Sequence, residues 1–204
     1  MMQILIGTGN YGKFQEIKEA LNELPFPFLY PKELNITENP EETGSTYEQN
    51  AILKARYFYE KSKIPVITDD SGIIVEALKN ELGVNTRRWG AGEQATDQEW
   101  LNYFLNKIST FTEPSQRKAL FICCACFYDG KTLKTFHGET LGQIERELKA
   151  KIIPGIPLSS CFRPDGFDKV YSSLTPQEKN QISHRGKAFH TLKTWLQQYH
   201  KKNV

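Results

Sequence analysis

Two adjacent aspartates, Asp69 and Asp70, follow a short apolar run in the segment IPVITDDSG, residues 64–72. The run predicts a buried strand over residues 64–68, and the end of a strand in an α/β sheet commonly carries polar groups that meet a ligand. Asp, Ser and Gly also favour turns, so a strand followed by a plain turn explains the same letters. Since neighbouring strand residues point to opposite faces, the two carboxylates are expected to have different surroundings.

A third carboxylate, Glu42, lies in NPEETGSTYEQN, shortly before a predicted helix. An acidic residue at such a place usually only complements the helix dipole. Together, however, Glu42 and Asp70 are two acids from separate segments, and this suits Mg²⁺. That ion prefers one or two carboxylates, keeps several waters and takes its remaining ligands from substrate phosphates. The pair therefore predicts a magnesium site for a phosphorylated substrate.

Cationic side chains gather in EKNQISHRGKA, where Lys179, His184 and Arg185 surround a predicted helix start with Ser183 as a candidate N-cap. Such groups at the positive end of a helix dipole suit an anionic ligand, such as a phosphate ester or a polyphosphate. A solvated basic helix start is the alternative. Further cations that could reach the same cleft are Lys54, Arg87 and Arg88.

A glycine-containing loop, TGNYGK at residues 8–13, precedes the first predicted helix. It matches neither the Walker pattern nor G-x-G-x-x-G. Its glycines nevertheless let the backbone approach a ligand, the following helix directs free N–H groups outward, and Lys13 adds a cation. An ordinary helix start with Asn10 as N-cap is the simpler explanation of the loop taken alone.

Strands are expected to position these residues. Apolar runs predict them over residues 3–6, 64–68 and 118–128, and a further extended piece follows the two aspartates. Asp129 and Gly130 predict the turn of a hairpin after the third strand.

Helices are expected between and after these strands. Capping boxes at Ser45 with Glu48 and at Thr96 with Glu99 predict two helix starts. Apolar residues at helical spacing predict one helix after the glycine loop and another near the C-terminal end. The pattern favours a single α/β domain over residues 1–204, with a mixed sheet flanked by helices and two lobes around a cleft.

Composition narrows the class of protein. The chain has 204 residues, of which 39% are apolar and 25% charged, as in an ordinary globular domain. Its 26 basic and 24 acidic residues leave a formal charge of +2, too balanced for a protein that coats nucleic acid. The N-terminal apolar run is too short for a signal peptide or a membrane span, so we expect a cytoplasmic location and no membrane partner. The four cysteines lack paired zinc-ligand spacing and are expected to be reduced and structural.

Four segments, TGNYGK, EETGSTYEQNAILKA, VITDDSGIIVEAL and EKNQISHRGKA, occur in the order and at about the distances seen in the inosine triphosphate pyrophosphatase family. Over nearly its whole length the chain resembles this family, whose members hydrolyse non-canonical purine nucleoside triphosphates. DDSG together with EKNxISHRGKA is much more specific than any single fragment. The resemblance implies an elongated α/β fold with a central mixed sheet, a cleft between two lobes and a homodimer.

By the same resemblance, the chain would cleave ITP, dITP and XTP between the α and β phosphates, releasing a nucleoside monophosphate and pyrophosphate, with magnesium required. Glu42 and Asp70 would hold the metal, and Asp70 would also accept the proton of the attacking water. Asp69 is expected on the other face of the strand, in a structural role. The residues expected to bind the nucleotide are Thr8, Gly9, Asn10, Tyr11, Gly12, Lys13, Lys54, Ser71, Arg88, Lys179, His184 and Arg185.

One segment departs from the family pattern. Where its members carry an aromatic-glycine-aromatic-aspartate stretch, this chain has Ile156, Pro157, Leu158 and Ser159. The aromatic wall against the purine and the acidic hydrogen-bond acceptor are both replaced, and such contacts can change base preference by orders of magnitude. Two alternatives therefore stay open: a related pyrophosphatase of altered base choice, and a nucleotide-binding module without catalysis.

Overall fold

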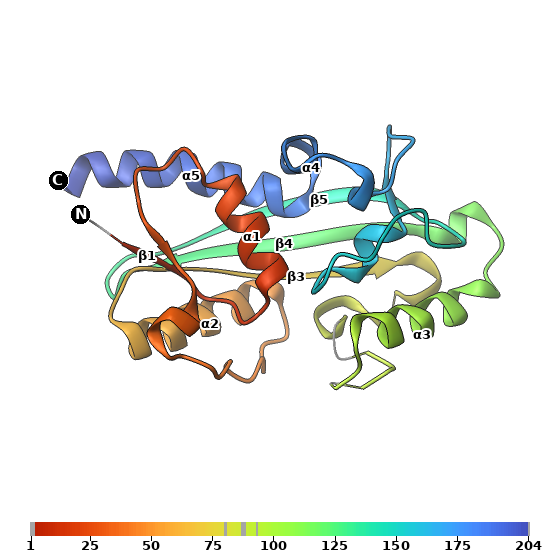
Figure 1. Ribbon diagram of the computed structural model, residues 1–204, viewed down its shortest axis with the longest axis horizontal. Helices are drawn as coiled ribbons and strands as arrows, with labels where there is room; N and C mark the ends of the chain where they lie inside the picture. The colour runs from red at the N-terminus through yellow and green to blue at the C-terminus, as the bar shows by residue number, and fades with distance from the viewer. Residues whose placement is uncertain (1–2, 80, 87–88, 93, 204) are drawn as a thin grey trace.

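A six-stranded mixed sheet runs along the length of the elongated molecule (Figure 1). The computed structural model describes residues 3–79, 81–86, 89–92 and 94–203. Strand order in the sheet is β2-β1-β3-β4-β5-β6, with β1 parallel to both β2 and β3 and the remaining pairs antiparallel. The strands are β1 (Ile4–Ile6), β2 (Phe28–Leu29), β3 (Val66–Val75), β4 (Lys118–Tyr128), β5 (Leu133–Ile144) and β6 (Phe162–Pro164).

Helices cover both faces of this sheet. Figure 1 shows α2 and α3 along one side and α1, α4 and α5 along the other, so the predicted mixed sheet with flanking helices is confirmed. The helices are α1 (Tyr11–Ala20), α2 (Tyr47–Ser62), α3 (Asp97–Ser109), α4 (Pro176–Ile182) and α5 (His184–Asn203).

The long strand β3 differs from its prediction. It starts two residues later than expected and continues through both aspartates to Val75, so the turn that was the alternative explanation of these letters is absent. All ten of its residues pair with β4, for example Asp69 with Ala125 and Asp70 with Cys124. Because β4 supplies ladder hydrogen bonds along the whole strand, the turn preference of Asp, Ser and Gly is overridden. The predicted strand over residues 118–128 and its hairpin with β5 are confirmed.

Helix caps test the local predictions. The capping box of Thr96 with Glu99 at α3 is confirmed. At α2 the expected cap, Ser45, is wrong by one residue, because Thr46 accepts the hydrogen bond from the backbone N–H of Gln49 at 3.1 Å. Ser45 instead donates its hydroxyl to the Gln49 side chain, so it reinforces the turn without capping it. The short helix α4 was not predicted.

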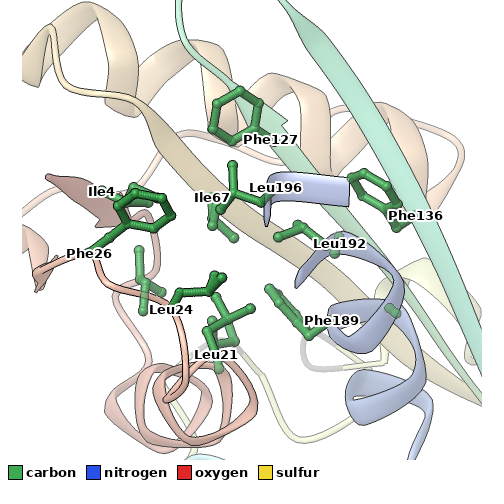
Figure 2. Packing of buried hydrophobic residues seen from close by; sticks show 14 of the residues in the cluster. Ile4, Leu21, Leu24, Phe26, Ile67, Phe127, Phe136, Phe189, Leu192 and Leu196 are labelled. Carbon is green, nitrogen blue, oxygen red and sulfur yellow. The ribbon is translucent and has the colours of Figure 1, made fainter. Parts of the chain in front are cut away.

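Of the four buried apolar clusters that the described residues form, the two largest lie along the sheet. The first, shown in Figure 2, joins β1, β3, β4 and β5 to α1 and α5 through side chains such as Ile67 and Leu192. The second gathers around α3 and β6 and includes Ile73 and Trp100. On one face of β3, therefore, Ile67 belongs to one core and Ile73 to the other, with residues 69 and 71 between them. The two predicted lobes correspond to these two cores, and a polar band divides them.

The cysteines behave as expected. Cys123, Cys124, Cys126 and Cys161 are free and buried. Burial raises the pKa of the Cys126 thiol to about 12, so the group stays protonated and unreactive at neutral pH. Across the residues that the structure describes, we find no helix with the length and apolar composition that a bilayer crossing requires.

Candidate active site

The loop between β1 and α1 is held rigidly. Asn10 caps α1 by accepting a hydrogen bond from the Lys13 backbone N–H at 3.0 Å, and its Nδ2 donates to the Gly155 carbonyl at 2.8 Å. A Cβ atom on Gly12 would lie 2.4 Å from the Pro154 carbonyl oxygen, so only glycine permits this close approach. The first turn of α1 is thus fixed against the segment around residue 154, and the start of a helix is a favourable place for an anion.

Neighbouring side chains hold the rest of the loop. Thr8 is buried, and its Oγ1 accepts a hydrogen bond from the backbone N–H two residues on, at 3.1 Å. The Gly9 carbonyl accepts one from the Tyr30 hydroxyl at 2.9 Å. Tyr11 is 61% exposed and rests its ring on Phe14 and Tyr30, so it lies at the outer rim of the loop.

Asp70 lies on the face of β3 that α2 covers. Lys54 Nζ is 2.7 Å from Glu42 Oε1 and 3.0 Å from Asp70 Oδ1, so one ammonium joins the two predicted metal ligands. Asn50 Nδ2 donates to Asp70 Oδ2 at 3.1 Å. Asn50 and Lys54 are four residues apart on α2 and therefore point the same way. We call Glu42, Asn50, Lys54 and Asp70 the Asp70 cluster.

Lys54 keeps its charge in this setting. Burial alone would lower the pKa of its ammonium, but the carboxylates of Asp70 and Glu42 outweigh burial and raise that pKa above its ordinary value. The Asp70 cluster therefore contains two carboxylates and one permanent cation.

Asp69 lies on the opposite face, as the alternation of strand residues predicts. Its Oδ2 is 3.2 Å from Arg185 Nε, 3.1 Å from Arg185 Nη2 and 3.4 Å from Lys13 Nζ. The same Arg185 Nη2 donates to Ser71 Oγ at 2.9 Å. Burial would raise the pKa of Asp69, but Lys13 and Arg185 hold it far below its usual range. Asp69 is a permanently charged anchor for two of the predicted nucleotide-binding cations.

Glu16 was not predicted from the sequence, although it lies at the centre of the cation group. One of its carboxylate oxygens pairs with Lys179 and the other with Arg185. Burial would raise the pKa of Glu16, but Arg185 and Lys179 lower it overall. The available signal was its spacing, because Glu16 follows Lys13 by three residues and so shares its helix face. We call Lys13, Glu16, Asp69, Ser71, Lys179 and Arg185 the Asp69 cluster.

His184 does not supply the charge that its place at a helix start suggested. Burial, followed by the nearby charges of Arg185 and Lys179, lowers the pKa of His184 well below its ordinary value, so the imidazole is neutral. The ring stacks on Phe121 with centroids 4.5 Å apart, and Tyr171 lies 6.2 Å away. Its Nδ1 has no hydrogen-bond partner within the described part of the chain. The cations of this segment are therefore Lys179 and Arg185.

The two clusters meet at one edge of β3. Register pairs join β1 to β3 only as far as Ile67, and Thr86 Oγ1 accepts a hydrogen bond from the Ile73 backbone N–H at 3.1 Å. Between these points, in the chain as described, no strand pairs with β3 on that side. Lys54 also lowers the pKa of Asp69, as one of several charges, so the two clusters share one electric field. Arg88, another predicted ligand, lies outside the described residues.

The segment that departs from the family pattern touches the same region. Pro157–Ser160 form a 3₁₀ turn in which Leu158 belongs to the second core. Ser159 is buried, and its Oγ accepts a hydrogen bond from Lys179 Nζ at 3.2 Å. A neutral hydroxyl thus stands beside a cation that Glu16 also contacts.

The residues at this site fit a metal ion that needs few protein ligands. Among the described residues no group of three or more His, Cys, Asp or Glu side chains could hold a metal ion. Glu42 and Asp70 do converge on a common cation position, which Lys54 Nζ marks. Two carboxylates suit an ion such as Mg²⁺, which completes its shell with water and substrate phosphates.

Comparison with known proteins gives a consistent result. Residues 4–195 match the Ham1 family. The chain is 37% identical over 194 residues to the dITP/XTP pyrophosphatase of Leptospira interrogans, covering 95% of this chain and 96% of that protein. It is 39% identical over 199 residues to the dITP/XTP pyrophosphatase of Aquifex aeolicus, covering 94% and 95%.

Solved structures agree with the sequence matches. A HAM1 protein from Coxiella burnetii superposes with a TM-score of 0.80 at 33% identity, over 97% of this chain and all of that one. The Staphylococcus aureus Ham1 protein gives a TM-score of 0.77 at 32% identity, over 97% and 99%. The likeness therefore extends over nearly the whole length of the chain.

Proposed function

The chain belongs to the Ham1 family, and from this premise we propose that it is a nucleoside triphosphate pyrophosphatase that hydrolyses non-canonical purine nucleotides. The relatives that it matches over nearly their whole length are dITP/XTP pyrophosphatases, so the substrate class is deaminated purine triphosphates such as dITP, ITP and XTP. The observation that carries this function is that adjacent residues of β3, Asp69 and Asp70, anchor a cationic cluster on one face and an acidic cluster on the other, close enough for Lys54 to lower the pKa of Asp69. Neighbouring acids and cations are what a metal-assisted reaction of a polyphosphate requires.

The binding step follows from the cations. A triphosphate carries about four negative charges, so a nucleophile reaches phosphorus only where fixed positive groups offset them. Lys13, Lys179 and Arg185 are already oriented by buried carboxylates. Such preorganisation lowers the reorganisation needed when charge develops in the transition state.

The Asp70 cluster would carry out bond cleavage. Glu42 and Asp70 would hold Mg²⁺, which when bound lowers the pKa of water and neutralises phosphate charge. Asp70 would accept a proton of the water that attacks phosphorus, while the bridging oxygen between the α and β phosphates leaves with the pyrophosphate. Before nucleotide binds, Asn50 fixes one Asp70 oxygen and Lys54 meets the other, so the carboxylate is already held in one orientation. The products are a nucleoside monophosphate and pyrophosphate.

The test is product identification. The full-length protein is incubated with ITP, dITP and XTP in magnesium buffer, with EDTA in a parallel reaction, and the products are separated by ion-exchange chromatography. Monophosphate plus pyrophosphate, lost with EDTA and restored by added magnesium, is the expected result. Diphosphate plus orthophosphate would refute the assigned cleavage site, and binding without turnover at any metal concentration would leave a nucleotide-binding module.

A second proposal concerns base choice and rests on Ser159. Because its hydroxyl can both donate and accept a hydrogen bond, it discriminates less strongly between purine edges than a carboxylate does. A panel including ATP and GTP, measured as kcat/KM, tests this proposal. Equal turnover across several bases supports altered preference, and strong selection of ITP or XTP contradicts it.

The remaining properties are also proposals. We propose that the protein removes non-canonical nucleotides from the nucleotide pool in the cytoplasm. We also propose that it acts as a homodimer and needs neither a nucleic acid nor a membrane as a partner. Light scattering coupled to gel filtration measures the oligomeric state, and a single species at the monomer mass would contradict the dimer.

A further inference from the structure

Lys54 holds an unusual position for a nucleotide-binding cation. Its ammonium lies between Glu42 Oε1 and Asp70 Oδ1, at 2.7 and 3.0 Å. The side chain is only 10% exposed, so this arrangement is part of the folded core rather than a surface ion pair. In this structure Lys54 therefore contacts the two acids and not an open phosphate site.

The position of the Lys54 ammonium affects the binding of a divalent ion through its charge. The ammonium of Lys54 offsets part of the negative charge that Glu42 and Asp70 would otherwise present to a metal. An ion entering between the carboxylates also meets the ammonium at close range, where like charges repel strongly in a partly buried setting. Asn50 engages the second Asp70 oxygen and further limits the free ligand positions.

A triphosphate changes this balance. Lysine is a point charge on a flexible four-carbon stem, so its ammonium can exchange one oxyanion for another. A phosphate oxygen beside the Asp70 cluster offers such an alternative partner and adds negative charge for the metal. Metal and substrate then favour each other's binding. The triphosphate draws the Lys54 ammonium away from the metal position, and the metal offsets the negative charge of the triphosphate.

We propose that Lys54 is a built-in counter-cation of the Glu42–Asp70 pair, which keeps free divalent ions from binding until a triphosphate draws its ammonium away. This role rests on the proposed function and makes Lys54 a positioning residue for metal entry. Its physiological meaning is that the metal enters together with the nucleotide, and the empty site does not collect ions.

Direct metal binding tests the proposal without any turnover. Mn²⁺ has similar oxygen-ligand preferences to Mg²⁺ and is counted by electron paramagnetic resonance as free ion disappears. Titrations of nucleotide-free protein compare the wild type with Lys54→Met, which keeps the length of the side chain and removes its charge. We expect the variant to bind one Mn²⁺ at least about tenfold more tightly than the wild type.

Three further variants make the result specific. Lys61→Met removes an exposed lysine from the same helix and should leave Mn²⁺ affinity unchanged. Lys54→Arg keeps the charge and should bind Mn²⁺ as weakly as the wild type. Adding Glu42→Gln to Lys54→Met should abolish the gained affinity, because the ion sits at that pair. Circular dichroism checks folding, and Lys54→Gln replaces the methionine variant if the latter does not fold.

Two results would overturn the proposal: tight Mn²⁺ binding by the nucleotide-free wild type, or no gain in affinity in folded Lys54→Met or Lys54→Gln. Neither depends on hydrolysis. Failure of the proposed function would be seen instead as the absence of monophosphate and pyrophosphate, so the two outcomes are separable.

Discussion

The two clusters on opposite faces of β3 are built from similar residues but have opposite excess charge. The Asp69 cluster sets the cations Lys13, Lys179 and Arg185 against two carboxylates and is left positive. The Asp70 cluster sets one lysine against Glu42 and Asp70 and is left negative. A positive site suits phosphates and a negative site suits a metal, so we propose that one strand separates the two functions by alternating its side chains.

The partners differ in stiffness as well. Asp69 is held by an arginine, whose planar guanidinium fixes geometry through several donors. Asp70 is held by a lysine and an amide, which exchange partners more easily. Two adjacent aspartates on one strand can therefore have separate roles, one in stability and the other in chemistry.

The largest effect is expected from Asp70→Asn. The variant loses the proton acceptor and one metal ligand, so kcat for ITP should fall at least about a thousandfold. Folding should persist, because Lys54 still pairs with Glu42 and the amide replaces the carboxylate without a change of shape. Pyrophosphate release and thermal denaturation measure the two quantities. Retained turnover would remove Asp70 from its catalytic role.

Asp69→Asn should show the opposite behaviour. It removes the charge of one of the two carboxylates that pair with the buried Arg185, while Glu16 keeps its pair, so we expect a loss of about 3 kcal/mol in the free energy of unfolding, at the lower end of the cost of breaking a buried ion pair. Urea denaturation measures this loss, with the exposed Asp168→Asn as the matched control. If Asp69→Asn proved as stable as the control while losing activity, the proposed division between the two aspartates would be wrong.

Much of the fold could be predicted because its signals are local. The 118–128 strand follows an uninterrupted apolar run, and α3 starts at its capping box. The course of β3 through the aspartates could not be predicted, because strand pairing with β4 and cations from three distant segments stabilise it. Local turn propensity contains no information about either.

The candidate site divides in the same way. Glu42, Lys54 and Asp70 were grouped from residue types and family resemblance, and they meet in space. Glu16 was missed because a single glutamate on an amphipathic helix has no distinctive pattern. The neutral state of His184 was also missed, since it depends on burial and on neighbouring cations that only the fold brings together.

Glu16→Gln tests whether Glu16 orients the cations of the positive cluster. The amide accepts a hydrogen bond from only one of the two cations and places its NH₂ against the other. The free energy of unfolding should fall by about 2 kcal/mol. The KM for ITP should rise more than kcat falls, because Lys179 and Arg185 lose their common orientation. A fall in kcat alone would indicate that Glu16 takes part in the chemical step.

The smallest effect is a pH dependence of stability that comes from His184, the neighbour of Arg185 in the positive cluster. His184 has a pKa well below its ordinary 6.5, since burial and then Arg185 and Lys179 oppose its protonation. The unfolded chain therefore binds this proton more readily, and His184's contribution to stability is complete above about pH 6.5 and lost as the pH falls below it. The slope should reach about 1.4 kcal/mol per pH unit.

Urea denaturation between pH 6.5 and 5 measures this slope in a window above the ordinary pKa of 4.5 for Glu16. His184→Phe keeps a flat ring against Phe121 and cannot titrate, so its stability should be nearly flat across the window. His190→Asn changes an exposed histidine on the same helix and should retain the wild-type slope. Equal slopes in the wild type and His184→Phe would mean that His184 is already protonated in the folded protein. The positive cluster would then hold one more charge than the comparison of the two faces assigns to it.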